Sequence, residues 1–311
     1  MTTRQMISIV TPCYNEEENI DELYKRVVAV MGEQPYDYEH ICIDNCSTDG
    51  TVKKIKELAA GDKRLKLIAN VRNFGHIRSP YHGILQSSGD ACILIASDLQ
   101  DPPEIISEFI NKWEQGYKIV MAVKPASEEP VLMFFLRKQY YRFISRISEV
   151  PLVQNSTGSG LFDRTVIEIL RTIRDPYPYF RGLLSEIGFP IAVVPFKQPK
   201  RKRGATKNNF YTLYDLAVLG ITNHSKVPLR LMAMSGFILA FLSVLVAIFY
   251  LVAKLLFWDS FQLGVAPILI GIFFFGAVQA FFIGIVGEYV SSIHTHVRNM
   301  PLVIESERVN F

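Results

Sequence analysis

The stretch Ala91-Cys-Ile-Leu-Ile-Ala-Ser-Asp-Leu-Gln-Asp-Pro-Pro-Glu104 passes from an apolar run into a polar loop and ends on two prolines and a glutamate. A short apolar run bounded by polar residues is typical of a buried β-strand, which we expect over residues 91–95. Proline is tolerated in the first turn of a helix, so the end of the stretch predicts a helix over residues 104–115. The polar loop between them would then lie at the carboxyl end of a buried strand.

The same succession of strand, polar loop and helix recurs along residues 1–122. Strands are expected over residues 7–10, 40–44, 65–69, 91–95 and 119–122, and helices over residues 17–31, 51–60, 77–86 and 104–115. Strands that alternate with helices of about 10–15 residues indicate βαβ units, which predicts an α/β fold with a mostly parallel sheet. Ligands of such sheets bind beyond the carboxyl ends of the strands, where the polar loops are expected to gather.

The composition of the 311 residues excludes several classes of protein. Hydrophobic residues make up 49% and charged residues 20%, so the chain is too apolar to be disordered. Four cysteines are too few for a disulfide scaffold, and they lack the paired spacing of metal ligands. A net charge of +3 gives no indication of nucleic-acid binding, and we expect no nucleic-acid partner.

Much of the hydrophobic excess lies near the C-terminus. Residues 231–253 carry no charge, and residues 264–287 contain Gln279 as their one strongly polar side chain. About 20 apolar residues span the hydrocarbon core of a bilayer, whereas buried core segments usually contain about 10–14 in a row. The pattern predicts a two-helix transmembrane hairpin with spans at 231–258 and 264–288, in preference to a pair of buried core helices.

The charges beside these segments predict their orientation. Basic residues precede the first segment, in Lys200–Lys207 and at Lys226 and Arg230, whereas the hairpin tip carries only Lys254. Cytoplasmic flanks carry the excess of Lys and Arg, so residues 1–230 and the tail 289–311 are expected in the cytoplasm. Residues 6–12 are too short for the apolar part of a signal peptide, and none is expected. The chain is therefore predicted to be a multi-pass membrane protein with two spans.

The loop from Asp98 to Asp101 offers oxygen ligands for a metal ion. No glycine-rich phosphate-binding motif follows the first predicted strand, so a phosphate group would need another means of attachment. Mg²⁺ is typically held by one or two carboxylates together with substrate phosphates, and Asp98, Gln100 and Asp101 offer oxygens of this kind. In the alternative interpretation, Asp101 caps the following helix and Asp98 is an ordinary solvated carboxylate.

Four polar loops occur in an order that resembles a known family. They are Pro12-x-Tyr14-Asn15-Glu16, Asp44-x-x-Ser47-x-Asp49-Gly50, Asn73-x-Gly75 and Asp98-Leu-Gln-Asp-Pro-Pro-Glu104. This set is similar to the family-2 glycosyltransferases with the GT-A nucleotide-sugar-binding fold. With two apolar segments behind it, the chain looks like a polyisoprenyl-phosphate glycosyltransferase of the GtrB type, a relative of dolichol-phosphate mannose synthase and of bactoprenol glucosyltransferase. The resemblance extends over essentially the whole chain, including Pro176–Gly182 and Arg203–Lys207.

The resemblance implies a role for each loop. The donor, a UDP-sugar, would be bound by residues of all four loops: Pro12, Tyr14, Asn15, Glu16, Asp44, Asn73 and Asp98. Asp98 and Gln100 would hold Mg²⁺ or Mn²⁺ on the diphosphate. The sequence departs from the family pattern in two places. Ala96 replaces the first carboxylate of the usual Asp-x-Asp. Residues 155–163 lack the Asp that relatives place around Thr157-Gly158, so no catalytic base is assigned there.

The implied acceptor is a polyprenyl phosphate, whose phosphate has a second pKa of about 6 and is mostly ionised at pH 7. Such an oxygen needs no base, and the difficulty lies in bringing two anionic groups together. Cationic side chains therefore join Asp98 as candidate catalytic residues: Lys124, Arg137, Arg201, Arg203 and Lys207. The basic segment Lys200–Lys207 has a second interpretation, as an anchor that attracts anionic lipid.

Two further segments are expected at the membrane surface. Residues 128–150 interleave aromatic and basic side chains, which is typical of an interfacial helix, although a core helix with snorkelling arginines shows the same pattern. Residues 208–230 form a second, juxtamembrane amphipathic segment. The predicted domains are a cytoplasmic GT-A domain over 1–207, this juxtamembrane segment, the two spans, and the tail 289–311.

These observations predict an inverting, metal-dependent enzyme that moves one sugar, glucose by family resemblance, from a UDP-sugar to polyprenyl phosphate on the cytoplasmic face of the membrane. A processive polysaccharide synthase is an alternative, disfavoured because neither Trp113 nor Trp258 follows an arginine as in the Gln-x-x-Arg-Trp motif. A membrane scaffold or flippase component without enzymatic activity is a third. Residues 301–305 also predict a strand that pairs with a neighbouring subunit, which would make the chain a homo-oligomer.

Overall fold

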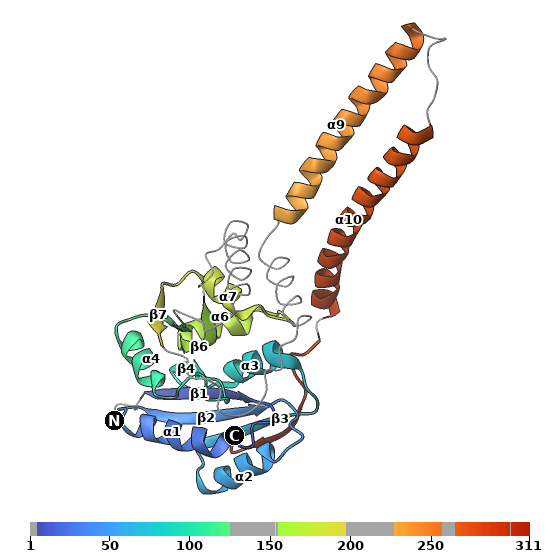
Figure 1. Cartoon of the computed structure of the whole chain (residues 1–311). Coiled ribbons are helices and arrows are strands. Elements are labelled where there is room, and N and C mark those ends of the chain that lie inside the picture. The colour runs from blue at the N-terminus through green and yellow to red at the C-terminus, as the bar shows by residue number, and fades with distance from the viewer. Residues whose placement is uncertain (1–4, 125–152, 154, 197–226, 257–264, 299) are drawn as a thin grey trace.

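The computed structural model describes residues 5–124, 153, 155–196, 227–256, 265–298 and 300–311. Figure 1 shows an α/β domain from which two long helices extend. The predicted interfacial helix at 128–150, most of the juxtamembrane segment 208–230 and the predicted hairpin tip lie outside the described residues.

The domain is built on one mixed sheet. Its strands along the chain are β1 (Met6–Cys13), β2 (Asp37–Asp44), β3 (Leu65–Asn70), β4 (Ala91–Leu94), β5 (Ile119–Val123), β6 (Ser156–Asp163), β7 (Ile191–Pro195) and β8 (Glu305–Val309). Their order across the sheet is β7-β5-β6-β4-β1-β2-β3-β8. The pairs β4–β1, β1–β2, β2–β3 and β5–β7 are parallel, whereas β6 and β8 run antiparallel to their neighbours. The predicted α/β fold with a mostly parallel sheet is confirmed.

The predicted polar loops all leave the sheet at one edge. The register places Cys13 at the end of β1 opposite Asp44 at the end of β2, and Asp44 opposite Ala69 in β3. Strand β4 runs parallel to β1 on its other side, so the loop after β4 reaches the same edge. Strand β5 also ends there, because both β4 and β5 are antiparallel to β6. We call this edge the strand-end edge.

Strand β6 lies between β4 and β5, a position that the alternation of apolar and polar runs does not predict. Its first half, Ser156-Thr-Gly-Ser-Gly160, has too few apolar side chains to resemble a buried strand. Gly160 is required at this point, because a Cβ atom there would lie 2.3 Å from the carbonyl oxygen of Val120 in β5. Strand β6 therefore crosses the sheet interior with its backbone close to that of β5.

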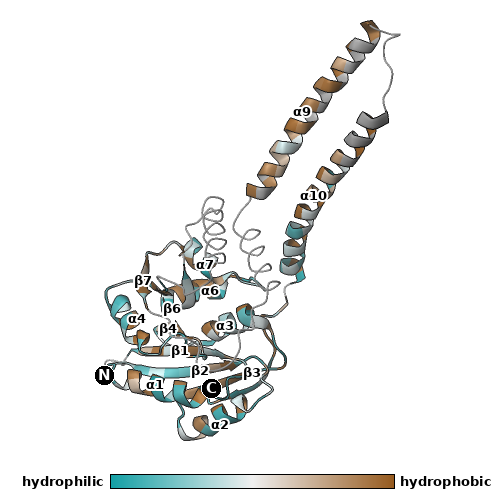
Figure 2. Cartoon of the chain, in the orientation of Figure 1, coloured by the Kyte–Doolittle hydropathy of each residue, from teal (hydrophilic) through white to brown (hydrophobic). Residues whose placement is uncertain are grey.

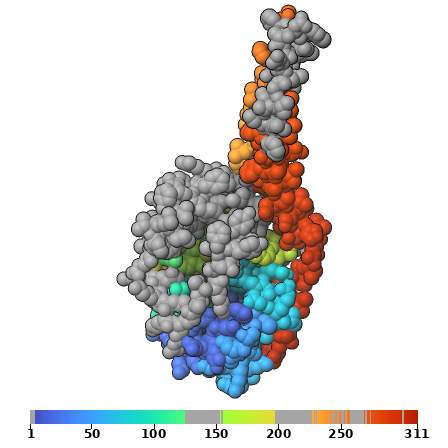
Figure 3. Space-filling model, turned by 45° about the vertical axis from the view of Figure 1, so that its right-hand side comes forward, coloured from blue at the N-terminus to red at the C-terminus, as the bar shows by residue number. Residues whose placement is uncertain are grey.

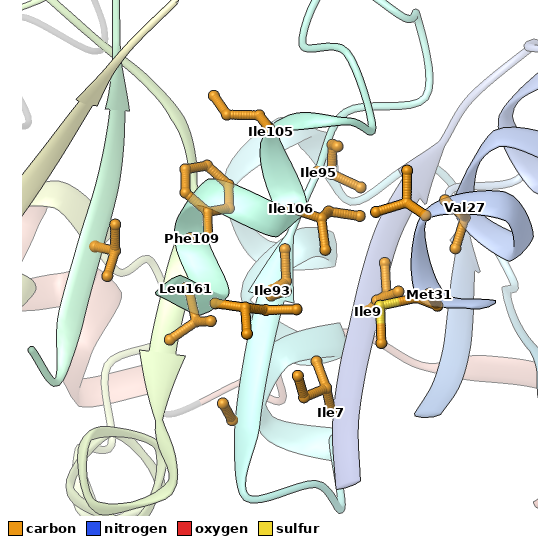
Figure 4. Packing of buried hydrophobic residues seen from close by; sticks show 14 of the residues in the cluster. Ile7, Ile9, Val27, Met31, Ile93, Ile95, Ile105, Ile106, Phe109 and Leu161 are labelled. Atoms are coloured by element: carbon orange, nitrogen blue, oxygen red, sulfur yellow. The ribbon is translucent and has the colours of Figure 1, made fainter. Parts of the chain in front are cut away.

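Helices cover both faces of the sheet. These are α1 (Ile20–Gly32), α2 (Thr51–Gly61), α3 (Gly75–Gln86), α4 (Ile105–Glu114), α6 (Arg164–Thr172) and α7 (Phe180–Ile187). The two long helices that extend from the domain are α9 (Val227–Leu256) and α10 (Val265–Arg298). Figure 4 shows one core, in which Phe109 of α4 and Met31 of α1 cluster with Ile9 of β1. Val10, the next residue of β1, points to the opposite face and packs in the cluster that contains α3, α6 and α7. The sheet is thus the middle of three layers.

Helix α4 begins at Ile105, one residue after its predicted start at Glu104. The backbone N–H of Ile105 donates to the carbonyl of Pro102, and the turn continues until Glu104 takes the N-cap position. The interpretation that makes Asp101 a helix cap is therefore wrong, because Asp101 precedes the cap by three positions along the chain. The other predicted helices and strands begin close to their expected positions.

The C-terminal residues return to the sheet of their own chain. The prediction of a strand over 301–305 that pairs with a neighbouring subunit is wrong, because β8 begins at Glu305 and pairs antiparallel with β3, with Val309 opposite Leu67. Asn310 then donates from Nδ2 to the carbonyl oxygens of Ala59 and Leu65, both at 2.8 Å. A strand pattern indicates pairing but not its partner. Here β8 covers an edge that β3 would otherwise expose.

Helices α9 and α10 carry hydrophobic residues along much of their length (Figure 2). Within the part of the chain that the structure describes, Phe274–Arg298 of α10 is the segment long and apolar enough to cross a membrane, judged by length and composition. None of its apolar window is buried, and the Phe281 side chain is 65% exposed. Continuous exposed apolar surface of this kind marks contact with lipid or with another protein.

Candidate active site

Each of the four polar loops contains one residue with a positive φ angle. These residues are Asn15 (55°), Cys46 (66°), Gly75 (87°) and Leu99 (57°). Glycine adopts this conformation readily and asparagine tolerates it, but it is strained for a bulky residue such as Leu99. Strained backbone of this kind collects at ligand-binding sites, where the surrounding structure holds it in place. The loops therefore share a conformational feature that is typical of a functional site.

The loop after β1 is fastened to the loop after β2 by Asn15. Its backbone N–H donates to Ser47 Oγ at 2.8 Å, and its side-chain Oδ1 accepts from the backbone N–H of Thr48 at 2.8 Å. Pro12 and Tyr14 of the same segment are half-buried. Asn15 thus uses its side-chain oxygen to join two loops, and it positions the neighbouring Tyr14.

Two carboxylates border this pair of loops. Asp44 is 1% exposed and accepts hydrogen bonds from both the backbone N–H and the hydroxyl of Ser47. Burial raises the pKa of Asp44, although the hydrogen bonds from Ser47 oppose this effect. Glu16 is half-buried and accepts from Asn19 Nδ2 at 2.7 Å. Asp44 is the more rigidly held of the two, as a fixed acceptor for a ligand needs to be.

A buried amide joins the loops after β2 and β3. Asn45 is 7% exposed, and its Nδ2 donates to Asn73 Oδ1 at 2.8 Å and to the carbonyl of Gly75 at 3.1 Å. Its Oδ1 accepts from the backbone N–H of Phe74 at 2.8 Å. Asn73 Oδ1 also accepts from the backbone N–H of Gly75. Because the amide oxygen of Asn73 is used within the loop, a ligand contact by Asn73 would involve its amide nitrogen.

Asp98 and Gln100 flank the strained Leu99 in the loop after β4. Asp98 Oδ1 accepts from the backbone N–H of Gln100 at 3.1 Å, and both side chains are half-buried. Over the described residues, no group of three or more His, Cys, Asp or Glu side chains has the arrangement of a metal site. One carboxylate and one amide oxygen are hard ligands that suit Mg²⁺ or Mn²⁺ when a substrate diphosphate supplies further oxygens. The donor set fits a metal held jointly by protein and substrate.

Asp101 has a different environment from Asp98. It is 3% exposed, accepts from the hydroxyl of Ser159 in β6, and leaves a buried Oδ1 without a hydrogen bond within the described residues. Burial raises the pKa of Asp101, and the hydrogen bond from Ser159 opposes this effect. The charge of Asp98 also raises this pKa, whereas that of Lys124, which directly follows β5, lowers it.

The structure brings most of the predicted site residues to the strand-end edge. Those that it describes there are Pro12, Tyr14, Asn15, Glu16, Asp44, Asn73, Asp98, Gln100 and Lys124. The remaining predicted residues, Arg137, Arg201, Arg203 and Lys207, lie outside the described residues.

Residues 8–171, which include all four loops, match the model of the family described as Glycosyl transferase family 2. This chain belongs to glycosyl transferase family 2. It is therefore a glycosyltransferase, and the expected enzyme class is confirmed.

Relatives of this family 2 glycosyltransferase match it over its whole length. It is 33% identical over 302 residues to an uncharacterized glycosyltransferase of Synechocystis sp., a match that covers 97% of this chain and 95% of that protein. It is also 33% identical over 307 residues to the prophage-derived bactoprenol glucosyl transferase of Shigella flexneri, which covers 98% of this chain and 99% of that protein.

A solved structure supports the fold of the family 2 domain. Glucosyl-3-phosphoglycerate synthase from Mycobacterium tuberculosis, in complex with Mn²⁺, UDP and phosphoglyceric acid, superposes with a TM-score of 0.51. The match covers 70% of this chain and 76% of that chain at 19% sequence identity. At this identity the likeness shows the shared α/β architecture alone.

Two parts of the family 2 site are absent from the sequence-based set. Asn45 joins the loops after β2 and β3, and the signal that could have indicated it is its place directly after Asp44 at a strand end. Ser159 holds Asp101 across 58 positions of sequence. Residues 155–163 lack the expected acid, and what this segment contributes to the site is the hydroxyl of Ser159.

Proposed function

We propose that this glycosyltransferase transfers a single glucose from UDP-glucose to a polyprenyl phosphate of the bactoprenol type. The observation that carries the proposal is the 33% identity to the bactoprenol glucosyl transferase of Shigella flexneri, over 98% of this chain and 99% of that protein. The match includes the C-terminal helices as well as the α/β domain. The similarity to this protein therefore extends to the C-terminal helices and is not limited to the nucleotide-sugar-binding fold.

The donor is proposed to bind across the loops at the strand-end edge. Pro12 and Tyr14 would form the apolar wall for the uracil ring, and Asp44, which Ser47 holds in place, would accept a hydrogen bond from it. A planar base needs such a wall and a small number of fixed polar partners. The proposed donor-binding residues are Pro12, Tyr14, Asn15, Glu16, Asp44, Asn73 and Asp98.

Asp98 and Gln100 are proposed to hold Mg²⁺ or Mn²⁺ against the donor diphosphate. When bound, the ion neutralises charge that develops on the departing UDP. The backbone N–H of Gln100 orients the Asp98 carboxylate for this role. Asp101 is bonded to Ser159, so we assign it to holding the loop in its strained conformation.

The acceptor phosphate is proposed to attack the sugar without a general base. Its oxygen is already anionic at pH 7, and it forms a bond to the anomeric carbon as the bond to UDP breaks on the opposite face, with inversion. Cations that offset the repulsion between the two phosphate groups would lower the barrier. The proposed cations are Lys124, Arg137, Arg201, Arg203 and Lys207.

The C-terminal helices are proposed to place this chemistry at a membrane. We assign spans to 231–258 and 264–288 as a hairpin, with the GT-A domain 1–207 and the tail 289–311 in the cytoplasm. The exposed apolar surface of Phe274–Arg298 and the basic residues before α9 support this assignment. The segments 128–150 and 208–230 would then lie at the headgroup level.

With purified full-length protein, UDP-glucose, Mg²⁺ and undecaprenyl phosphate, we expect a lipid product heavier than the acceptor by one hexose. Mass spectrometry of the extracted lipid measures this increment. Transfer from UDP-glucose should be at least about 10-fold faster than transfer from UDP-galactose or UDP-N-acetylglucosamine. A site built around one sugar rejects others that leave its polar groups unpaired. A ladder of products with several hexoses would indicate a processive synthase, and the absence of lipid product with every donor would contradict the proposal.

A further inference from the structure

A group of basic side chains lies beyond the residues assigned to the donor, and we call it the cationic group after its three arginines. Arg72 belongs to the loop after β3, His76 and Arg78 to the first turn of α3, and Arg181 to the first turn of α7. Within the described part of the chain, none of the four forms an ion pair with a carboxylate. Cations gathered without counter-charges repel one another, and an anion bound among them removes that cost.

Phe74 and the end of α10 hold two of these cations in place. The Cζ atoms of Arg72 and Arg78 lie 4.0 Å and 5.3 Å from the centroid of the Phe74 ring. Arg78 donates from Nη2 to the carbonyl oxygen of Pro301, just beyond α10, and its buried Nε makes no hydrogen bond within the described residues. Burial lowers the pKa of Arg78, and the charge of Arg72 adds to this effect.

Arg181 lies against strand β6, next to the serine that holds Asp101. Its Nη2 is 3.6 Å from the position that a Cβ atom on Gly158 would occupy, and Gly158 directly precedes Ser159, the hydrogen-bond partner of Asp101. His76 is exposed in accessible area but closely surrounded by protein atoms, and this desolvation lowers its pKa, with a further contribution from the charge of Arg181. The guanidinium of Arg181 therefore lies against β6 beside Ser159. The neighbouring Phe180 packs edge-on against Tyr81 of α3, with ring centroids 5.8 Å apart, which brings α7 next to the helix that carries His76.

The helices that carry these side chains add to the positive potential. The first turns of α3 and α7 contain no acidic residue, although an acid there would stabilise the helix, and they carry His76, Arg78 and Arg181 instead. The backbone N–H groups at a helix N-terminus attract anions. The N-termini of α3 and α7 thus add positive potential beside His76 and Arg181, which have no acidic partner within the described residues.

The cationic group also lies where α10 meets the domain. His296 in the last turn of α10 pairs with Asp175 at 3.3 Å, and Asp175 lies just before α7. Figure 3 shows the cyan residues of α3, the yellow-green residues around α7 and the red base of α10 together on one face. A lipid embedded beside α10 would present its phosphate at this level.

We propose that Arg181 and His76 form a binding subsite for a substrate phosphate group, and that this group is the monophosphate of the acceptor lipid. The proposal rests on the proposed function, because it takes polyprenyl phosphate as the acceptor. Arg72 and Arg78 act at longer range, by adding positive potential and by holding Phe74 and the α10 connection in place. The diphosphate of the donor could occupy the same subsite. Loss of the subsite would then raise the KM for UDP-glucose, whereas binding of the acceptor phosphate predicts a higher KM for undecaprenyl phosphate.

Replacing Arg181 by glutamine in the full-length protein should raise the KM for undecaprenyl phosphate by about 10-fold or more, since the lost hydrogen bonds are to a charged group. The KM for UDP-glucose should stay within about 2-fold of the wild-type value. Arg181→Lys, which keeps the charge, should recover part of the loss. A rise in the KM for UDP-glucose alone would overturn the assignment to the acceptor, and no change in either KM would overturn the subsite.

Arg174→Gln is the matched control, because Arg174 is exposed and lies outside the cationic group. Equal losses in Arg174→Gln and Arg181→Gln would mean that net charge alone matters and would overturn the proposal. If Arg181→Gln lowers the melting temperature, His76→Gln, at an exposed side chain, carries the same KM test. If the wild-type protein turns over no UDP-sugar, the proposed function fails. Calorimetric binding of farnesyl phosphate to the wild-type and Arg181→Gln proteins then decides the subsite, with about 10-fold weaker binding by the variant expected and equal binding overturning it.

Discussion

Replacing Asp98 by asparagine is expected to lower kcat/KM for sugar transfer by about 100-fold or more. The substitution keeps an oxygen that accepts from the backbone N–H of Gln100, so the loop is retained while the negative charge is lost. Ala96 has no carboxylate to replace it, and Asp101 is buried and hydrogen-bonded to Ser159 through Oδ2. Release of UDP at saturating UDP-glucose and Mg²⁺ measures the effect.

Glu108→Gln is the control for this experiment. It removes one carboxylate from an exposed position on α4, close in sequence but outside the site, and should leave the rate within about 2-fold. The melting temperature of Asp98→Asn should equal that of the wild-type protein, because the side chain is only half-buried. An Asp98→Asn protein that keeps its full rate would show that the metal assignment is wrong.

Removing residues 305–311 is expected to destabilise the α/β domain by about 3 kcal/mol and to lower its melting temperature by about 6–12 °C. The deletion takes away strand β8, its ladder with β3 and the two hydrogen bonds from Asn310. It also exposes the edge of β3, which favours aggregation. Thermal unfolding of the full-length and shortened proteins in the same detergent measures the difference.

Lys56→Ala is the control that distinguishes the effect of losing strand β8 from the effect of losing its surface ion pair. Lys56 pairs with Glu307 of β8, but both side chains are more than one-third exposed, and such pairs contribute at most about 1 kcal/mol. The substitution should therefore shift the melting temperature by no more than about 2–4 °C. If the shortened protein melts at the same temperature as the full-length protein, β8 does not stabilise the domain.

The strand-end edge could be predicted because parallel strands buried on both faces are continuous apolar runs. The run from Ile7 to Val10 and the run from Ala91 to Ile95 each end abruptly in polar residues. Once the strands are parallel, their loops meet at one edge whatever the order of the strands. The loops that carry the proposed donor-binding and metal-binding residues therefore lie at one edge of the sheet, as the sequence predicts.

The two antiparallel strands could not be placed in this way. Strand β6 is rich in Gly and Ser because its backbone passes close to β5, and strand β8, Glu-Ser-Glu-Arg-Val, is charged because it lies at an edge. Neither has the apolar run that marks a buried strand. Contacts between residues far apart in the sequence, such as the hydrogen bond from Ser159 to Asp101, could not be predicted either. The sequence likewise does not show that α7, which carries Arg181, packs beside α3, which carries His76.

Acceptor-dependent release of UDP tests most directly the proposal that this chain transfers glucose to a polyprenyl phosphate. Purified full-length protein with UDP-glucose and Mg²⁺ is assayed with and without undecaprenyl phosphate. We expect the release of UDP to require undecaprenyl phosphate, to saturate as the concentration of this lipid rises, and to be lost in Asp98→Asn. Binding of UDP-glucose with no UDP release in the presence of the lipid, or release at the same rate with and without it, would contradict the account.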